Sequence, residues 1–299
     1  MRVNEALLLG HGVVRTHDFP SLRSSWGPHI SAGRLIRALP GVLMDAGLAA
    51  DPVAWMRAVH RWDHNAVLAG AAASFLTFDA EADLDEILVC ARTRLADRGP
   101  IRFLRHALDP DLATWVRGVR VTTPAATALT AGLRGDYATA TNALRLGVAS
   151  QESLRDASER LTVRPREPLV HVLHNLSANP WSVAEVDAHR LFRAAGIRGW
   201  VGNYEVVVDG HAFAIDIALP ESRIAFEINS FEFHSRREDM MRDSSRANLL
   251  ASAGWRQYVL LPTQVSNQPR ETMEFVRQVV WARHRGASNV SCTGNRGTR

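Results

Sequence analysis

The sequence of 299 residues predicts an α+β protein built from more than one domain. Three observations support this. Short helices and a small hairpin fill the first 48 residues or so, helices occupy much of 124–177, and strands alternate with capped helices from Ser182 onward. The expected organisation is an N-terminal domain (1–80), a mainly helical middle region (81–165), an α/β domain with a mixed sheet (166–286) and a flexible tail (287–299).

The N-terminal region reads as three helices followed by a hairpin. Asn4–Leu9 begins a short apolar helix, and Thr16 is suited to cap a second. A third is expected over Ser24–Ala32. The stretch "GRLIRALPGVLM" (33–44) then alternates and turns at Pro40-Gly41. This order of elements is that of a winged helix-turn-helix.

The middle of the chain shows fewer strand signals than helix signals. Residues 54–77 read as helical, and Val116–Thr122 reads as a strand. Thr123-Pro124 is a good helix opening, because proline at the first helical position loses no hydrogen bond. The stretch "TVRPREP" (162–168) combines proline with charge and is the best linker candidate.

The C-terminal region alternates between helices and short strands. Ser182 and Glu185 form a capping-box pattern ahead of a helix that ends near Gly196, and Ser235 and Glu238 form a second one. The expected strands are Tyr204–Val208, 215–219, 224–228 and Trp255–Leu261. Later helices are expected over Ser235–Ala253 and Glu271–Arg285.

Carboxylates interrupt the apolar alternation of the hairpin "IDIALPESRIAFEIN". One predicted face carries the apolar side chains Ile215, Ile217, Leu219, Ile224, Phe226 and Ile228. The opposite face would gather Asp216, Glu227 and Asn229. Two such carboxylates suit a hard divalent cation, which would activate water for phosphodiester hydrolysis.

Further residues would complete such a centre. Glu185 would add a ligand and His234 a general base. The alternative is a solvated sheet face, or carboxylates paired with Arg223, Arg236 or Arg242, and the spacing alone leaves both readings open.

Composition limits the chemistry. The basic residues are 35 arginines without a single lysine, so no lysine acts as a base, Schiff-base former or phosphate clamp. Cys90 and Cys292 make neither a disulfide framework nor a zinc pattern. No apolar run is long enough to span a membrane, and the first residues do not read as a signal peptide. A cytoplasmic protein without a membrane partner is expected.

Other candidate sites have ordinary structural explanations. His60 and His64 are four apart, a metal-ligand spacing, but surface or packing roles are favoured for them and for His171 and His174. Core positions are favoured for Trp181, Trp200 and Trp255. The arginines at 236, 237, 242 and 246 either face DNA as a basic stripe or pair with nearby acids on the same helix, and both readings stay open.

Residues 177–265 resemble the PD-(D/E)XK nuclease-like domains of very-short-patch-repair endonucleases. The matching residues are Glu185, Asp216, Glu227, His234, Asp243, Arg246 and Trp255-Arg256. The resemblance implies a restriction-endonuclease-like fold. It departs at Asn229, where the family carries lysine or aspartate, and a neutral amide neither orients attacking water as an ammonium does nor adds metal-binding charge. A nuclease fold without catalysis, and so without magnesium or another cofactor, is expected. If active, it would use Glu185, Asp216, Glu227 and His234 with magnesium on Asp216 and Glu227.

"RVNEALLLGHGVVRTHDFPS" and "ISAGRLIRALPGVLM" resemble the winged-helix module of abortive-infection type IV antitoxins. The resemblance implies operator DNA as ligand and a nucleotidyltransferase toxin as partner. Ser24–Ala32 would be the recognition helix in a major groove, with Ser24, Ser25 and His29 reaching base edges. Arg15, Arg23, Arg34 and Arg37 would contact phosphates. We therefore expect a DNA-binding autoregulator and antitoxin; the alternatives are a magnesium-dependent endonuclease and a protein-interaction scaffold.

Overall fold

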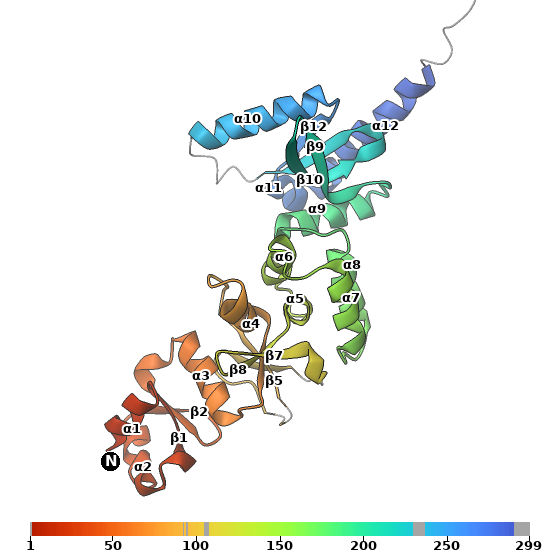
Figure 1. Ribbon diagram of the computed structural model, residues 1–299. Coiled ribbons are helices and arrows are strands. Elements are labelled where there is room, and N and C mark those ends of the chain that lie inside the picture. Colours follow the sequence, from red (N-terminus) through yellow and green to blue (C-terminus); the bar gives the residue numbers. More distant parts are fainter. Residues whose placement is uncertain (1, 92, 94, 105–107, 230–236, 290–299) are drawn as a thin grey trace, which may run out of the picture. The chain divides into compact units, whose positions relative to one another are not determined.

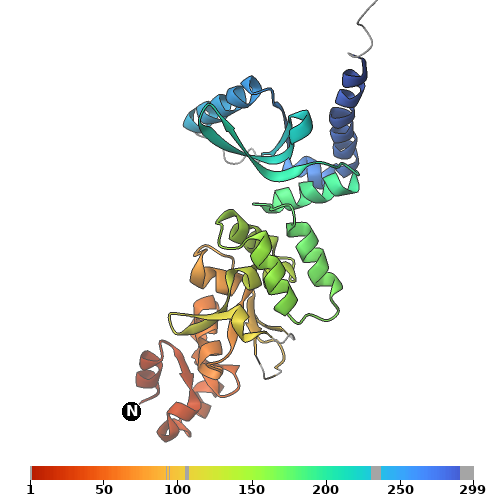
Figure 2. The ribbon, with the colours of Figure 1, turned by 45° about the vertical axis from the view of Figure 1, so that its right-hand side comes forward.

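The computed structural model describes residues 2–91, 93, 95–104, 108–229 and 237–289. The chain divides into two compact units, Met1–Leu173 and His174–Arg299. Each has its own apolar core. The first unit has two sheets and the second has one, as the ribbons of Figure 1 and, after a turn of 45°, Figure 2 show. The class is α+β, as predicted. The boundary lies inside helix α8 (Glu167–Leu176), downstream of the expected junction at 165/166.

The first unit begins with a three-stranded antiparallel sheet in the order β1-β3-β2. Its elements are α1 (Val3–Leu9), β1 (Val13–Arg15), the 3-10 turns η1 (Thr16–Asp18) and η2 (Pro20–Leu22), α2 (Trp26–Ser31), β2 (Leu35–Leu39), β3 (Val42–Asp45) and η3 (Ala46–Leu48). The hairpin predicted over 33–44 is confirmed, with its turn at Pro40-Gly41. The prediction of an α-helix that begins at Thr16 is wrong, because residues Thr16–Asp18 form only a 3-10 turn. Thr16 does not cap, since its hydroxyl donates to the carbonyl of Gly41 over 3.2 Å.

A second sheet of five strands follows, in the order β6-β5-β4-β8-β7. Its strands are β4 (Val67–Ala69), β5 (Ile87–Cys90), β6 (Ile101–Leu104), β7 (Ala113–Val116) and β8 (Val119–Thr122). The middle region is therefore not mainly helical between 81 and 122. In strands of three or four residues, the alternation of apolar and polar side chains is too short to be recognised in the sequence. The single strand expected over Val116–Thr122 is instead the turn and second strand of the β7–β8 hairpin.

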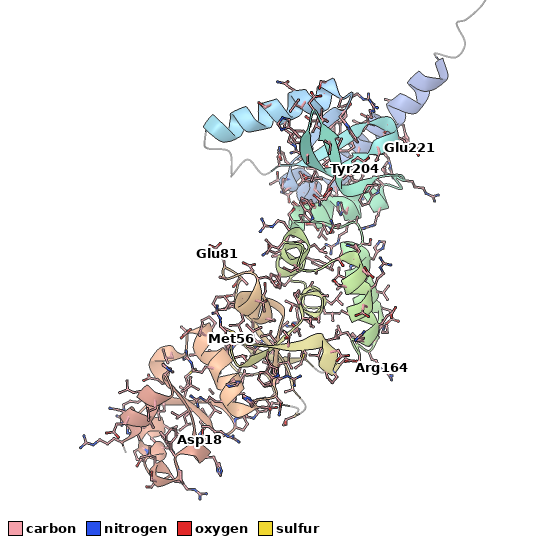
Figure 3. The ribbon with its side chains drawn as sticks, in the orientation of Figure 1. Asp18, Met56, Glu81, Arg164, Tyr204 and Glu221 are labelled. Atoms are coloured by element: carbon pink, nitrogen blue, oxygen red, sulfur yellow. The ribbon has the colours of Figure 1, made fainter. Side chains whose placement is uncertain are left out.

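The helix expected over 54–77 is in fact two helices with a strand between them. Helix α3 (Pro52–Trp62) leads into β4 and then α4 (Gly70–Thr77). Gly70 marks the change of direction: its φ is 54°, and a Cβ there would lie 2.7 Å from a methyl carbon of Leu88. Met56 of α3, labelled in Figure 3, is buried in a core that joins α3 to both sheets.

Helices complete the first unit, as expected from Pro124 onward. They are α5 (Pro124–Gly132), α6 (Tyr137–Arg145), α7 (Gln151–Arg160) and the start of α8. Every residue of α5 from Ala125 to Gly132 is buried. Small side chains permit this close packing: a Cβ on Gly132 would lie 2.6 Å from a methyl carbon of Val172 in α8.

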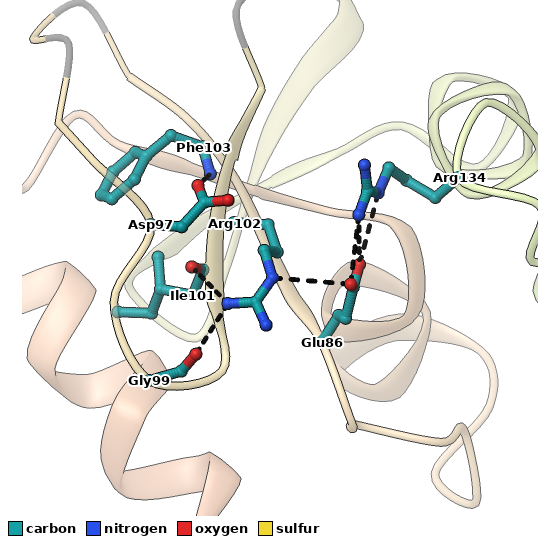
Figure 4. Close-up of polar contacts among 7 residues, drawn as sticks. All are labelled: Glu86, Asp97, Gly99, Ile101, Arg102, Phe103 and Arg134. Carbon is teal, nitrogen blue, oxygen red and sulfur yellow. Dashed lines mark hydrogen bonds and ion pairs between the residues drawn. The ribbon is translucent and has the colours of Figure 1, made fainter.

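Glu86 ties the five-stranded sheet to helix α5, as Figure 4 shows. Its carboxylate accepts from Arg134, just beyond α5, over 3.1 Å and pairs with Arg102 of β6 over 3.5 Å. Arg102 also donates to the carbonyl of Gly99 over 2.7 Å. Since Glu86 and both arginines are partly exposed, these contacts fix geometry more than they add stability.

The second unit is a four-stranded mixed sheet in the order β12-β11-β10-β9, with only the β11–β12 pair parallel. Its elements are α9 (Val183–Ala194), β9 (Val201–Val208), β10 (His211–Leu219), the 3-10 turn η5 (Pro220–Ser222), β11 (Ile224–Ile228), α10 (Arg237–Ser252), β12 (Arg256–Leu260), α11 (Pro262–Asn267) and α12 (Pro269–Asn289). This matches the predicted order closely. Residues 287–289, expected in the tail, are the end of α12, and 290–299 lie outside the described residues.

Two apolar clusters cover the two sides of this sheet. Helices α9, α11 and α12 pack on Ile217, Leu219, Ile224 and Phe226. The end of α10 packs on the other side, against Ala218, Ala225 and Trp255. Ile215 belongs to the α10 side, so the prediction that it shares a face with Ile217 is wrong.

The cause of this change of side lies at Asn203 and Asp216. Asn203 has a φ of 45°, and the ladder between β9 and β10 lacks a pairing of Asn203 with Asp216. Irregularities of this kind re-aim side chains next to functional sites.

Candidate functional site

Asp216 and Glu227 meet where strands β10 and β11 separate. The register that pairs Ile217 with Phe226 would, one step further, set Asp216 opposite Glu227. The Asp216 carboxylate (Oδ2) accepts a hydrogen bond from the backbone N–H of Ile228 over 2.7 Å, which replaces a ladder bond at this point. The predicted meeting of these two carboxylates is confirmed. Like charges directly opposite each other on neighbouring strands are unfavourable.

Arg246 of α10 supplies the positive charge at this position. Its Nη2 donates to Oε1 of Glu227 over 2.9 Å and also to the backbone carbonyl of Ala214. The Glu227 side chain is only 8% exposed, so this is a buried ion pair. Arg246 was expected either on a DNA-facing stripe or paired with acids of its own helix, and its partner is instead a glutamate on the sheet.

Glu185 is the third acid, and both of its carboxylate oxygens accept hydrogen bonds. Oε1 accepts from the hydroxyl of Ser182 over 3.0 Å. Oε2 accepts from the N–H of Trp181 over 2.9 Å and from the side-chain amide of Asn203 over 2.6 Å. The N–H of Glu185 in turn donates to Ser182, so half of the predicted capping box forms as expected. Glu185 therefore joins helix α9 to strand β9 through its hydrogen bond with Asn203.

Burial raises the pKa values of all three acids, and the charge of Asp216 adds to the shift of the other two. Burial, followed by the negative charge of Asp216, raises the pKa of Glu227 to about 8, while Arg246 opposes the shift. Burial raises the pKa of Asp216 against the opposing effects of the Ile228 N–H and Arg246. The pKa of Glu185 is raised by burial and by the charge of Asp216. The cluster therefore binds protons more readily than ordinary carboxylates do.

His189 lies one turn after Glu185 on α9 and is fully buried. The backbone of Asp216 faces its imidazole and opposes the lowering of its pKa, and the ring lies 4.9 Å from that of Trp200. Burial, together with the charge of Arg193, lowers the pKa of His189 to about 4. Gly202 makes room for it, because a Cβ at that position would lie 2.8 Å from His189 Cε1.

Of the remaining members of the predicted nuclease site, Asn229 is not in the cluster. Asn229 is exposed beyond the end of β11, with its backbone N–H bonded to Leu260. His234 lies outside the described residues, as does Arg236. Among the residues that the structure describes, no three histidine, cysteine, aspartate or glutamate side chains are grouped to hold a metal ion. With Arg246 on Glu227 and the oxygens of Glu185 occupied, the cluster is a poor fit for magnesium.

Sequence reasoning missed two members of this arrangement, Asn203 and His189. A polar residue within the strand "VGNYEVVV" was a signal for Asn203. The i, i+4 spacing from Glu185 was a signal for His189. Trp255 is buried in the core, as expected, whereas Trp181 and Trp200 are only partly buried.

The predicted DNA-contacting residues surround α2 and the β2–β3 hairpin. Arg15, Arg23, Arg34 and Arg37 are exposed, as is Ser24. Ser25 and His29 are half-buried, and Ser24 and Ser25 precede α2 rather than lying in it.

Two of these residues contact each other. Arg34 Nε donates to His29 Nδ1 over 3.3 Å, and both line a pocket of about 370 Å³ together with Asp45 of β3. His29 is therefore oriented by Arg34. Arg15 lines a different pocket, on the β1 side of the same sheet.

No family model matches the chain, and no curated protein matches it. Among solved structures, the crystal structure of RV2827C protein from Mycobacterium tuberculosis is similar at 18% sequence identity. The match covers 63% of this chain and 79% of that chain, with a TM-score of 0.40. A TM-score of this size supports no conclusion about function. None of the described helices is long and apolar enough to cross a bilayer.

Proposed function

We propose that this chain is a cytoplasmic DNA-binding transcription regulator that represses its own operon. It would be the antitoxin of a pair whose toxin is a nucleotidyltransferase. The order helix, strand, turns, short helix and hairpin, with the sheet order β1-β3-β2, supports the proposal of a winged helix. The resemblance of residues 2–44 to type IV antitoxins supports the role, with Ser24, Ser25 and His29 toward the bases.

The observation that carries the proposal is the set of unpaired arginines around the short helix and the hairpin. Arg23, Arg34 and Arg37 are exposed, and among the described residues none of them forms an ion pair. Unpaired exposed guanidinium groups gain most from a polyanion, because binding releases the counterions condensed on DNA. Arg15 extends the same charge along β1.

The C-terminal unit would keep the nuclease-like fold without its chemistry. Two features support this: Arg246 neutralises Glu227, and Asn229 offers no charge at the strand end. Its remaining role would be a second DNA-facing surface or a contact used against the toxin.

Fluorescence anisotropy on duplex DNA from upstream of the gene tests the DNA proposal. The R34A/R37A variant should bind every sequence more weakly, with a salt slope lower by about 0.9 per lost phosphate contact. The R145A/R155A variant is the matched control, since Arg145 and Arg155 are exposed on α6 and α7. Unchanged affinity in R34A/R37A would overturn the assigned surface.

The antitoxin role has a separate test. A nucleotidyltransferase encoded beside this gene should arrest growth when expressed alone and should not do so when this chain is expressed with it. Continued arrest in the presence of this chain would contradict the antitoxin role while leaving DNA binding intact.

A magnesium-dependent endonuclease is the second candidate, favoured by one observation. The charge of Asp216 raises the pKa values of Glu185 and Glu227, and a bound cation relieves such repulsion. Incubation with plasmid and Mg²⁺ or Mn²⁺ decides between the candidates. Cutting that disappears in D216A would establish the endonuclease, and intact plasmid would support the regulator.

A further inference from the structure

A pocket of about 470 Å³ opens beside strand β1, on the side of the three-stranded sheet that α3 covers. Val13 packs in the core shared with α3, whereas Val14 packs with Trp26 of α2. Because side chains alternate along a strand, Arg15 points to the α3 side. The pocket is lined by His11, Arg15, Asp18, Arg57, His60, Arg61 and His64.

Helix α3 contributes a row of basic side chains to this pocket. Arg57 lies three residues before His60 and four before Arg61, so these side chains share one side of α3, and His64 follows two residues after the helix ends. The opposite face, with Trp55 and Val59, is buried. Helix α3 therefore packs its apolar face against the core, and its basic side chains line the pocket.

The row is partly fixed in position before any ligand arrives. Arg57 Nη1 donates to the backbone carbonyl of His11 over 2.9 Å. The rings of His60 and His64 share a hydrogen bond of 3.3 Å between Nε2 and Nδ1. His64 also lies 5.1 Å from the ring of Trp115 in β7. Pre-organised donors lose less entropy when a ligand binds.

The charge of the pocket is unbalanced. Asp18, labelled in Figure 3, is the one acid among the lining residues. Within the described part of the chain, Arg15, Arg57 and Arg61 form no ion pair. Burial lowers the pKa of His60, and the charges of His64 and Arg61 lower it further. An anion would relieve this repulsion.

We propose that this pocket binds a phosphate group, held by Arg57 and Arg61 of α3 with Arg15 of β1 and the His60–His64 pair closing the site. Guanidinium groups bind phosphate oxygens in pairs of parallel hydrogen bonds, which suits arginines that line one pocket, with Arg15 exposed and Arg57 and Arg61 half-buried. The residue after Arg15, Thr16, donates its N–H to Gly41 in the hairpin turn over 2.8 Å, so the pocket adjoins that hairpin.

The phosphate has two possible sources, the backbone of bound DNA or a free phosphorylated molecule. The first rests on the proposed function, because the hairpin would have to lie on DNA. The second does not. Both use the same arginines, and so the same variants test them.

Isothermal titration with inorganic phosphate and pyrophosphate tests the pocket directly. The full chain should bind at one saturable site, and R57Q/R61Q should weaken binding at least about tenfold, since two charge-assisted hydrogen bonds are lost. The R145Q/R155Q variant removes the same charge at exposed positions outside the pocket and should bind like the parent. R61Q alone keeps the Arg57–His11 bond, so it covers the case in which the double variant misfolds.

The salt dependence of DNA binding distinguishes the two sources. If the phosphate belongs to DNA, R57Q/R61Q lowers the salt slope while R145Q/R155Q does not. If it belongs to a free molecule, phosphate binding falls in R57Q/R61Q and the DNA slope stays at the parental value. The proposal is overturned if R57Q/R61Q matches the parent in both experiments. Absence of DNA binding by the parent would remove only the proposed function, because the phosphate titration still decides on the pocket.

Discussion

Arg246 and Glu227 form an ion pair of 2.9 Å that joins helix α10 to strand β11 across the interior of the second unit. The pair stands beside Asp216, and the backbone carbonyl of Ala214 accepts from the same guanidinium nitrogen. Breaking a buried pair costs more than the pair itself contributes, because it leaves an uncompensated charge.

Removing Arg246 should destabilise the second unit. At pH 9, where Glu227 with its pKa of about 8 is ionised, we expect R246Q to lower the free energy of unfolding by about 3 kcal/mol, as for other broken buried pairs. Hydrogen exchange of the β10 and β11 amides in the full chain measures this. R256Q, at an exposed position on β12, is the control. Equal protection in both variants would show that the pair contributes nothing.

The stability of this unit should fall as the pH rises from about 6.5 to 8. The folded pKa of Glu227, about 8, lies above its unfolded value, so the folded chain holds the extra proton in this interval and deprotonation favours unfolding. The raised pKa values of Asp216 and Glu185 act with the same sign. Hydrogen exchange across this range should show the decline, and E227Q should flatten it. A parent curve that rises between pH 6.5 and 8 would contradict the assigned shift.

His189 acts in the opposite direction below pH 6.5. Its pKa is lowered to about 4 in the folded chain, so the unfolded chain binds this proton first between pH 6.5 and 4, and this acid-side loss of stability offsets part of the gain from the raised pKa of Glu227. His189→Leu removes the titrating ring and should reduce this acid-side loss relative to the parent. An acid limb of the same steepness in both proteins would exclude His189 as its cause.

Gly202 should not tolerate a side chain. A Cβ there would lie 2.2 Å from the backbone oxygen of Ala178 and 2.8 Å from His189. We expect G202A to cost about 2 kcal/mol through overpacking, measured by the same exchange experiment. G27A is the control, because a Cβ on Gly27 meets nothing within 4 Å. Equal stability of G202A and the parent would mean that Ala178 moves away freely.

His29 and Arg34 should act on DNA as one unit. Because Arg34 holds the His29 ring through a 3.3 Å hydrogen bond, losses from H29A and R34A should not add. A double-mutant cycle on DNA affinity should give a coupling energy above about 0.5 kcal/mol. No hydrogen bond joins His29 to Arg37 among the described residues, so the cycle for that pair should be additive. Additivity in both cycles would contradict the contact.

The elements that the sequence predicted well are those with long or capped patterns. Helix α9, strands β9 to β11 and the meeting of Asp216 with Glu227 follow from capping residues, turn residues and alternation. Strands β4 to β6 were not predicted, because in three or four residues the alternation of side chains is too short to distinguish a strand from a buried helix segment.

The details of the site were harder to predict. The partner of Glu227 depends on α10 packing against the sheet, which no local pattern reports. The switch of Ile215 to the α10 side depends on Asn203, whose positive φ is a property of the tertiary fold. The basic pocket needs α3 and β1 side by side, and the sequence favoured only surface or packing roles for its members His60 and His64.

The complete enclosure of helix α5 has a consequence for recognition by other proteins. A helix with every residue from Ala125 to Gly132 shielded has no surface to offer. Any molecule that docks on the helical part of this unit therefore has to read the outward faces of its neighbours, where Leu146 and Val148 stand exposed just after α6.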